Sequence, residues 1–238
     1  MELVFVKNKY IHFFTFILVI CFSFLVIYCN ELSTYTLFYN DNEEILDVDI
    51  NAISKRLNEY NNSDVVGILN IPGVYSNAIV QTFDNDFYLN HSLDKSYDYR
   101  GTVFLDYRVN IDRNSKLLVY GHSSKYEELD FNFLQNYYSD AYYYNKNKFI
   151  EILTYEGKKR YEIFSVYVEV SDYTYMKTKF NSDNEYLTHI NKLKDKSIYP
   201  SDIKLSSDDD ILILQTCSTH SDYDNYEKKY LLVIARRV

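Results

Sequence analysis

The stretch that decides the fold is LILQTCSTHSDYDNYEKKYLLVIARRV, residues 212–238, in which two apolar runs flank a polar loop. The first run ends at Cys217 and the second begins at Tyr230. Both runs are rich in aliphatic and β-branched residues, which is typical of buried strands. Residues at strand ends face loops that leave room for a substrate. The stretch therefore predicts two strands, with a thiol at the end of the first.

Eight apolar runs of this kind occur along the chain. Turn signals such as IPG (71–73) and EGKK (156–159) separate several of them. The 238 residues include 27 Tyr and 15 Phe, and aromatic side chains pack well on pleated sheets. Eight runs predict a closed or nearly closed β-barrel. The predicted strands are 65–71, 76–83, 101–107, 115–121, 148–155, 160–170, 210–216 and 230–238.

Three stretches have helical spacing of apolar residues instead. The first is 43–60, for which Asp41 or Asn42 is the expected N-cap. The second is 126–136, and the third is 181–197. The fold class is therefore mainly β (α+β), an eight-stranded barrel with flanking helices.

An uncharged segment near the N-terminus predicts a transmembrane helix. Residues 10–29, YIHFFTFILVICFSFLVIYC, contain no Lys, Arg, Asp or Glu, and a helix needs roughly 20 apolar residues to cross a bilayer. Lys7 and Lys9 precede the segment, so the short N-terminus is expected in the cytoplasm. A cleaved signal peptide, or a lipoprotein signal ending at Cys29, is the alternative, and the bulky Tyr28 weighs against both.

The predicted organisation follows from this topology. Everything after the membrane segment is expected outside the cell, in one domain without internal repeats or low-complexity linkers. The expected parts are a cytoplasmic N-terminus (1–9), a signal anchor (10–29), a stalk (30–42) and an extracellular domain (43–238).

Composition excludes some functions. The chain has 5 glycines and no GxGxxG or GxxxxGK motif, so a phosphate-cradling loop is not expected. Its net charge of -9 makes nucleic acid an improbable partner, because phosphate binding needs a basic face.

The cysteine pattern points to chemistry at Cys217. Cys21 and Cys29 fall in the membrane segment, so the exported part has a single thiol and no internal disulfide. Such a thiol is either inert and buried or used. His122 ends another apolar run, KLLVYGHSS, and a Cys and a His together form a nucleophile and its proton partner. The other candidates for this partner are His220, His91 and His189.

Other chemistries fit the sequence less well. Cys217 and His220 form only half of a metal site, with no further ligands nearby. The acidic loop Asp222, Asp224 and Glu227 lacks the glycine turn of a calcium-binding EF-hand. A papain-type cysteine opens a helix, whereas Cys217 ends a predicted strand. No metal or cofactor is therefore expected.

Several segments, in order, resemble class B sortases: DVVGILNIPG (64–73), IVQTFDNDFYLNHSL (79–93), GTVFLDYR (101–108), LLVYGHSS (117–124), YEIFSVYVEV (161–170) and ILQTC (213–217). The resemblance covers about residues 43–238. It implies a membrane-anchored cysteine transpeptidase that needs no metal. Such an enzyme cleaves a C-terminal sorting motif after Thr, holds the product as a thioester, and transfers it to a cell-wall amine.

The resemblance also implies residue roles. Cys217 corresponds to the nucleophile, and His122 to the acid that protonates the leaving amine. Gln215 and Thr216, directly before the thiol, are expected to contact the substrate. Gln215 stands where the family often has a small residue, so the pocket beside the thiol is expected to differ in shape.

One departure from the family concerns the oxyanion. Family members carry an arginine at the start of the last strand, and counting back five from Ala235 gives Tyr230 instead. Tyr230 could donate its hydroxyl, Lys228 could reach in from the same face, or the alignment is shifted by one and Lys229 is the match. Arg236 lies about 20 Å further along the strand and is expected to be structural.

This departure leaves two other functions open. One is a weak or inactive sortase-like surface protein that binds sorting motifs. The other is a sortase that polymerises pilins, which differs only in the acceptor amine.

Overall fold

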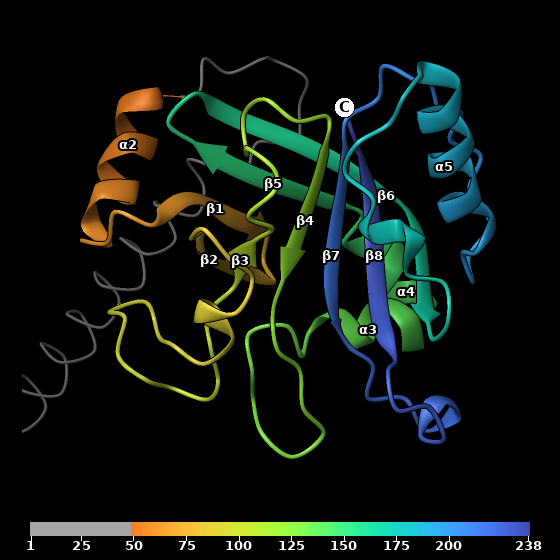
Figure 1. The fold of residues 1–238 in the computed structure, drawn as a ribbon, viewed down its shortest axis with the longest axis horizontal. Helices are drawn as coiled ribbons and strands as arrows, with labels where there is room; N and C mark the ends of the chain where they lie inside the picture. The colour runs from red at the N-terminus through yellow and green to blue at the C-terminus, as the bar shows by residue number, and fades with distance from the viewer. Residues whose placement is uncertain (1–48) are drawn as a thin grey trace, which may run out of the picture. The chain divides into compact units, whose positions relative to one another are not determined.

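Eight strands close into a barrel in the computed structural model, which describes residues 49–238 (Figure 1). The order of neighbours around the barrel is β1-β2-β3-β4-β7-β8-β6-β5. The predicted closed eight-stranded barrel is therefore confirmed. The strands are β1 (Val65–Ile71), β2 (Tyr75–Val80), β3 (Phe104–Leu105), β4 (Lys116–Tyr120), β5 (Phe149–Thr154), β6 (Gly157–Glu169), β7 (Ile211–Cys217) and β8 (Tyr230–Arg237).

Each predicted strand has a counterpart, but β3 is much shorter than the predicted 101–107. The chain turns after Leu105 because the Asp106 carboxylate accepts a hydrogen bond from the backbone N–H of Arg108 at 2.9 Å. The predicted turn at 156–159 is also displaced. Gly157 already pairs with Thr154, so the lysines that follow it belong to β6.

The helices agree with the sequence in part. Helix α2 (Ile50–Glu59) is capped by the Asp49 side chain, and the caps expected from the sequence, Asp41 or Asn42, lie outside the described residues. Helix α5 (Asp183–Asp195) confirms the helix predicted at 181–197. The helix predicted at 126–136 is wrong, since most of that segment is a loop. The loop leads into two short helices, α3 (Leu134–Ser139) and α4 (Ala141–Lys146). Short 3-10 helices occur elsewhere, at η1 (Phe87–Leu89), η2 (Tyr173–Met176) and η3 (Ser221–Tyr223).

The predicted membrane helix (10–29) and stalk (30–42) lie outside the described residues. Within residues 49–238, no helix combines the length and the apolar composition needed to cross a membrane.

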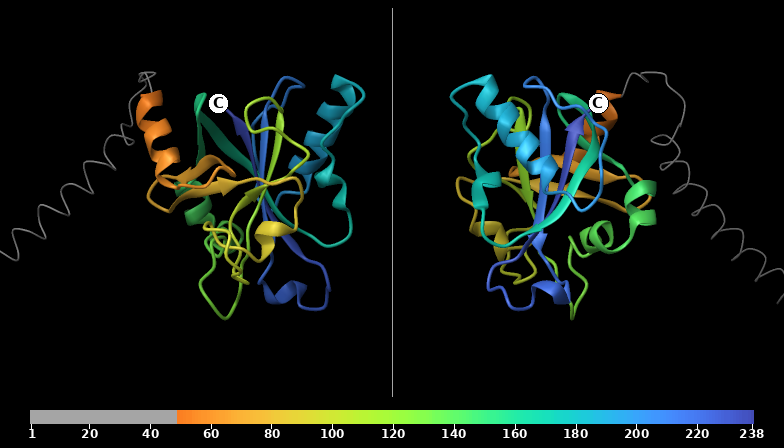
Figure 2. Two further views of the ribbon diagram at one scale, coloured as in Figure 1. Left: turned by 60° about the vertical axis from the view of Figure 1, so that its left-hand side comes forward. Right: turned by 90° about the vertical axis from the view of Figure 1, so that its right-hand side faces the viewer.

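The strands are buried on both faces. In β7, Leu212 and Leu214 join one apolar cluster, whereas Ile211 and Ile213 join a second. Helices α3 and α4 pack on the first cluster, and α2 and α5 pack on the second. Figures 1 and 2 show α2 and α5 on opposite sides of the barrel.

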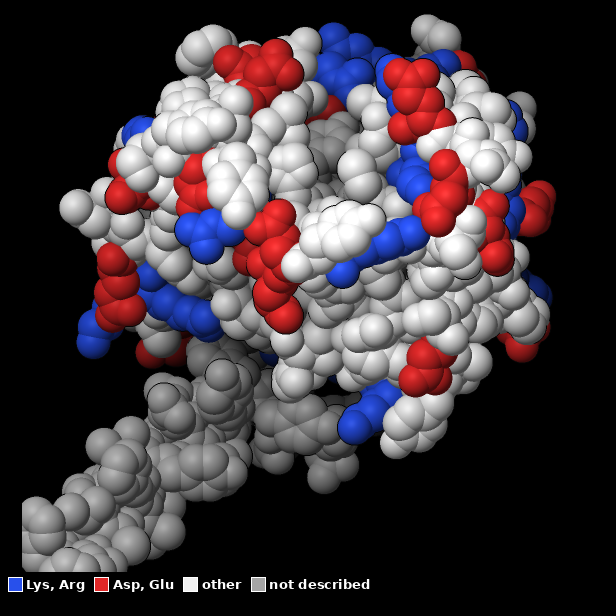
Figure 3. Space-filling model, turned by 90° about the horizontal axis from the view of Figure 1, so that it is seen from below, with Lys and Arg blue, Asp and Glu red and all other residues white. Residues whose placement is uncertain are grey.

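Three loops gather at the lower end of the barrel in Figure 1: 81–103, 121–133 and 218–229. Strands β4 and β7 both run towards this end, and the C-terminus lies at the other. Figure 3 views the lower end directly, where acidic and basic side chains are interspersed with uncharged surface and no patch of one sign dominates.

A buried lysine ties the segment after β6 to β4. Lys116 is only 2% exposed, and its ammonium donates hydrogen bonds to the backbone carbonyls of Tyr175 and Lys177. Burial, assisted by the charge of nearby Arg108 and opposed by Asp106, lowers the pKa of Lys116 to about 7. The tether holds η2 against the barrel.

We predict that Lys116→Met flattens the pH dependence of stability. The folded protein loses the Lys116 proton above about pH 7, whereas the unfolded chain keeps it up to about pH 10.5. Between about pH 7 and pH 9 the unfolded state binds more protons, so the free energy of unfolding rises with pH. Urea denaturation of a 47–238 fragment across this interval measures the slope. Lys177→Met is the control, and equal slopes for wild type and Lys116→Met would contradict the prediction.

Candidate active site

The parallel pairing of β4 with β7 builds the site. Tyr120 is the partner of Gln215, and the Gly121 N–H donates to the Gln215 carbonyl at 3.2 Å. Strand β4 ends at Tyr120, two residues before His122, and β7 ends at Cys217 itself, so both residues lie at the same end of this strand pair. Neighbouring strands lie about 4.8 Å apart. The two residues predicted from their strand ends thus lie at one end of two adjacent strands.

A glycine is needed directly before His122. A Cβ atom on Gly121 would lie 2.7 Å from the ring of Phe131, closer than real contacts allow. The Phe131 N–H also donates to the His122 carbonyl at 2.9 Å, which closes the loop after β4. This packing fixes the backbone of His122.

The imidazole of His122 is oriented by the loop between β2 and β3. Its Nε2 lies 2.8 Å from the backbone carbonyl of Leu89. A carbonyl can only accept, so Nε2 carries a hydrogen and Nδ1 is the nitrogen that takes up or releases a proton.

Cys217 is exposed and has no disulfide partner. Desolvation of the thiol by the surrounding protein raises the pKa of Cys217, and the ammonium of Lys229 partly opposes this shift. Conversion of this thiol to the reactive thiolate therefore depends on neighbouring donors and charges.

Tyr230 and Lys229 are both close to the thiol. Tyr230 is paired with Cys217 across β7 and β8, so both side chains lie on one face. Its ring packs edge-on against Tyr173, and desolvation, with smaller effects from Cys217 and Tyr173, raises the pKa of the Tyr230 phenol. Its hydroxyl thus stays protonated, and it can donate a hydrogen bond.

Lys229 is fixed at the start of β8. Its carbonyl accepts from the Ser218 N–H at 2.8 Å, and its ammonium lies 2.7 Å from an Asp224 oxygen. Lys228, in contrast, is exposed. Arg236 lies at the opposite end of β8, where its guanidinium donates to the Lys204 carbonyl at 3.3 Å.

The two residues before the thiol face opposite ways. Gln215 shares the face of Cys217, and its Oε1 accepts a hydrogen bond from the Tyr175 hydroxyl at 2.8 Å. Thr216 points to the other face and is only 2% exposed. The Thr216 side chain is therefore buried away from the face that carries Cys217, whereas Gln215 shares that face.

The rings of the other candidate histidines pack against aromatic side chains. His91 stacks on Phe87 within the β2–β3 loop, and His189 is buried in α5 against Phe180. His220 follows Cys217 but packs on the ring of Tyr138. The structure thus favours His122 as the partner of Cys217.

The acidic loop after β7 binds lysines. Asp224 accepts from both Lys125 and Lys229, at 2.9 and 2.7 Å. In the part of the chain that the structure describes, no group of three or more His, Cys, Asp or Glu side chains is arranged to hold a metal ion.

The sequence does not predict three hydrogen bonds at the site. The Leu89 carbonyl accepts from the His122 ring, the Tyr175 hydroxyl donates to the Gln215 side chain, and the Gln135 amide donates to the Cys217 carbonyl. None of these residues lies next to Cys217 or His122 in the sequence. The only sequence signal for any of them is the resemblance of residues 79–93, which include Leu89, to class B sortases.

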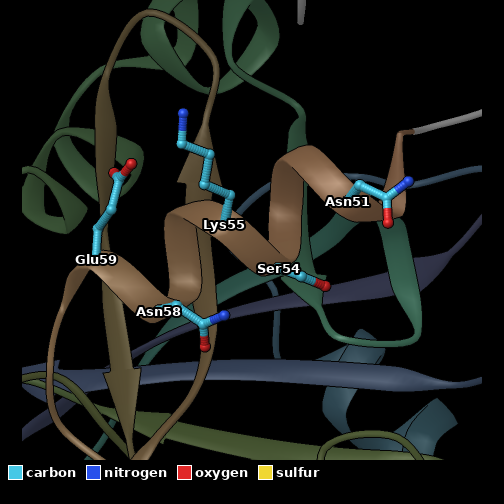
Figure 4. Close-up of a pocket in the computed structure, with 5 residues that line it drawn as sticks. All are labelled: Asn51, Ser54, Lys55, Asn58 and Glu59. Atoms are coloured by element: carbon cyan, nitrogen blue, oxygen red, sulfur yellow. The ribbon is translucent and has the colours of Figure 1, made fainter.

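A shallow pocket elsewhere is unrelated to the thiol. Figure 4 shows it on α2, and every residue that lines it belongs to this helix: Asn51, Ser54, Lys55, Asn58 and Glu59. Strands β4, β7 and β8 contribute none of its lining.

Comparison with known proteins agrees with this geometry. The family model described as the Sortase domain matches residues 69–238. Sortase B of Listeria monocytogenes serovar 1/2a is 34% identical over 173 residues, which cover 68% of this chain and 66% of the relative. Sortase B of Staphylococcus aureus is 29% identical over 177 residues, covering 74% of this chain and 70% of the relative. The chain thus spans just under two thirds of the Listeria protein.

Solved structures give the same result. Sortase B of Clostridium perfringens superposes with a TM-score of 0.69 at 30% identity, covering 78% of this chain and 99% of that one. A Staphylococcus aureus sortase B–substrate complex has a TM-score of 0.69 at 26% identity, with 78% and 86% covered. Because the family model spans more than half of the chain, this protein belongs to the sortase family of cysteine transpeptidases, and within that family to class B.

Proposed function

We propose that this protein is a membrane-anchored transpeptidase that joins surface proteins to a cell-wall amine. The single observation that supports the proposal is the β4–β7 pairing, which brings the segment that leads to His122 to the same end of the barrel as Cys217, the only thiol of the described residues. The substrate is a protein with a C-terminal sorting motif, cleaved after Thr. One similar protein was solved as a sortase B–substrate complex, which supports this class of substrate.

The first half of the reaction forms a thioester. The Cys217 thiolate attacks the carbonyl carbon of the scissile amide, and the carbonyl oxygen becomes an oxyanion. When this intermediate collapses, the C–N bond breaks and the leaving amine takes a proton from Nδ1 of His122. The Leu89 carbonyl holds Nε2–H throughout, so the proton moves at a single nitrogen.

The second half releases the product. The amine of the cell wall attacks the thioester carbon, and Nδ1 of His122 accepts a proton from the attacking nitrogen. The C–S bond then breaks, and Cys217 leaves as the thiolate. A pilin lysine could take the same place as the acceptor, so the site geometry supports both kinds of acceptor equally.

Two residues share the task of the family arginine. Tyr230 lies on the face of Cys217, and its protonated hydroxyl donates to the oxyanion. Lys229 supplies positive charge, which lowers the pKa of the thiol. Gln215 lines the adjoining part of the substrate groove, with its amide oriented by Tyr175.

The proposed location rests on residues 10–29. This uncharged segment would anchor the protein in the membrane, with the barrel outside the cell.

We predict that Cys217→Ala and His122→Ala abolish peptide cleavage. A quenched peptide library with Thr–Gly bonds is incubated with the 47–238 fragment, and mass spectrometry is used to detect a thioester on Cys217. Wild type should form the adduct, and Cys217→Ala should not. Binding without an adduct or turnover by wild type would instead favour the inactive binding protein.

We predict that Tyr230→Phe and Lys229→Met both lower kcat/KM about 10-fold or more, the usual cost of losing an oxyanion donor. Only Lys229→Met should also raise the thiol pKa, because it removes the positive charge near Cys217. The pH dependence of iodoacetamide alkylation measures this pKa in the 47–238 fragment, where Cys217 is the sole cysteine. Lys228→Met, at an exposed position, is the control. Unchanged rates for both variants would refute the assignment.

We predict that the full-length chain sediments with membranes and that deletion of residues 1–42 releases it. Protease added to intact cells should digest the barrel, because that part is expected outside. Protection of the barrel in intact cells, with digestion after lysis, would contradict the topology.

A further inference from the structure

A glutamine on α3 connects both catalytic strand ends. The Nε2 of Gln135 donates to the Cys217 carbonyl at 2.9 Å and to the Ser123 hydroxyl at 3.0 Å. Its Oε1 accepts from the Thr219 N–H at 3.2 Å. One side-chain amide therefore binds the residue after His122 and both sides of the turn that follows the thiol.

The position of this amide follows from the pattern of the sheet. The Gly121 N–H donates to the Gln215 carbonyl, which is the last bond of the β4–β7 ladder in this direction. Bonds in a parallel ladder recur every two residues, so Ser123 would be the next donor, to the Cys217 carbonyl. The chain has left the sheet by then, and the Gln135 amide supplies the missing donor.

The opposite neighbour of β7 cannot supply this donor. The Ser218 N–H donates to the Lys229 carbonyl, so Cys217 and Tyr230 form one of the non-hydrogen-bonded pairs of the antiparallel ladder. In such a pair, neither residue exchanges backbone hydrogen bonds with its partner. The Cys217 carbonyl thus relies on Gln135.

Helix α3 itself is held firmly in place. Leu134 and Tyr137 are fully buried, and Tyr138, one turn after Gln135, packs on His220 and bonds the Tyr223 hydroxyl at 2.8 Å. Gln135 is therefore presented from a packed helix, which gives its amide a defined position.

We infer that Gln135 is a positioning residue that sets the thiol of Cys217 relative to the imidazole of His122. The inference rests on the proposed transpeptidase function. Acyl transfer requires the reacting atoms to be held in a near-attack geometry, and a misplacement of about 1 Å costs about 100-fold in rate. Gln135 binds the backbone of Cys217 and the side chain of Ser123, the residue after His122, and it does not touch the reacting atoms.

The test uses the full-length protein in detergent micelles with two variants. Gln135→Leu removes all three hydrogen bonds at similar size, and Gln135→Glu keeps an acceptor for Thr219 but loses the donors to Cys217 and Ser123. Both should lower the rate of thioester formation about 10- to 100-fold, with KM within about twofold. Asn136→Leu, at the exposed neighbouring position on α3, is the matched control and should keep the wild-type rate.

A second readout separates positioning from loss of structure. Iodoacetamide reacts with the thiol without needing His122, so alkylation of Cys217, mapped by mass spectrometry, should stay within about twofold of wild type. Hydrogen exchange should quicken at 217–220, where the Thr219 N–H loses its acceptor in Gln135→Leu. Wild-type acylation rates in both variants would overturn the inference, as would a rise in alkylation that matches the fall in acylation.

The outcome also distinguishes this inference from the proposed function. If the wild-type protein forms no thioester, the proposed transpeptidase function is overturned. Hydrogen exchange at 217–220 then tests on its own whether Gln135 holds the turn after Cys217. Exchange in Gln135→Leu equal to wild type would show that Gln135 does not hold the turn after Cys217.

Discussion

The parallel pairing of β4 with β7 is the constraint on which the site depends. Parallel neighbours cannot be joined by a tight turn, so β5, β6 and α5 all lie in the connection between them. Both strands are buried on their two faces, and a slip of one residue would turn every side chain to the wrong cluster. Core packing therefore fixes the register, and the register brings the strand ends that lead to His122 and Cys217 to the same end of the barrel.

The electrostatics of the thiol reflect a balance of two opposing effects. Desolvation favours the neutral thiol, whereas Lys229 favours the thiolate. Asp224 binds the Lys229 ammonium and so offsets part of its field at the sulfur. A largely protonated thiol resists oxidation, which suits an exposed cysteine. Tyr230 adds a hydroxyl but no charge, so the site contains less positive charge than one with an arginine at that position.

The sequence predicts what depends on periodicity and strand ends. Alternating apolar residues identify the strands, and the runs that lead to Cys217 and His122 locate the proposed nucleophile and its proton partner. Side-chain bonds to the backbone are invisible to periodicity, which is why the shortening of β3 at Asp106 was missed. The path of loop 121–133, and with it the contacts of Gln135, depends on tertiary packing such as that of Phe131 on Gly121. Such packing has no local sequence signal.

Strand β4 links recognition to chemistry. Its last residues lead to His122, and its first residue, Lys116, holds the backbone of η2. Tyr175 of η2 in turn orients the Gln215 amide beside the thiol. Opposite ends of one buried strand thus position the Gln215 amide and lead to His122. A change that loosens Lys116 should therefore alter recognition before chemistry, because the β4–β7 ladder that aligns His122 with Cys217 does not involve the Lys116 side chain.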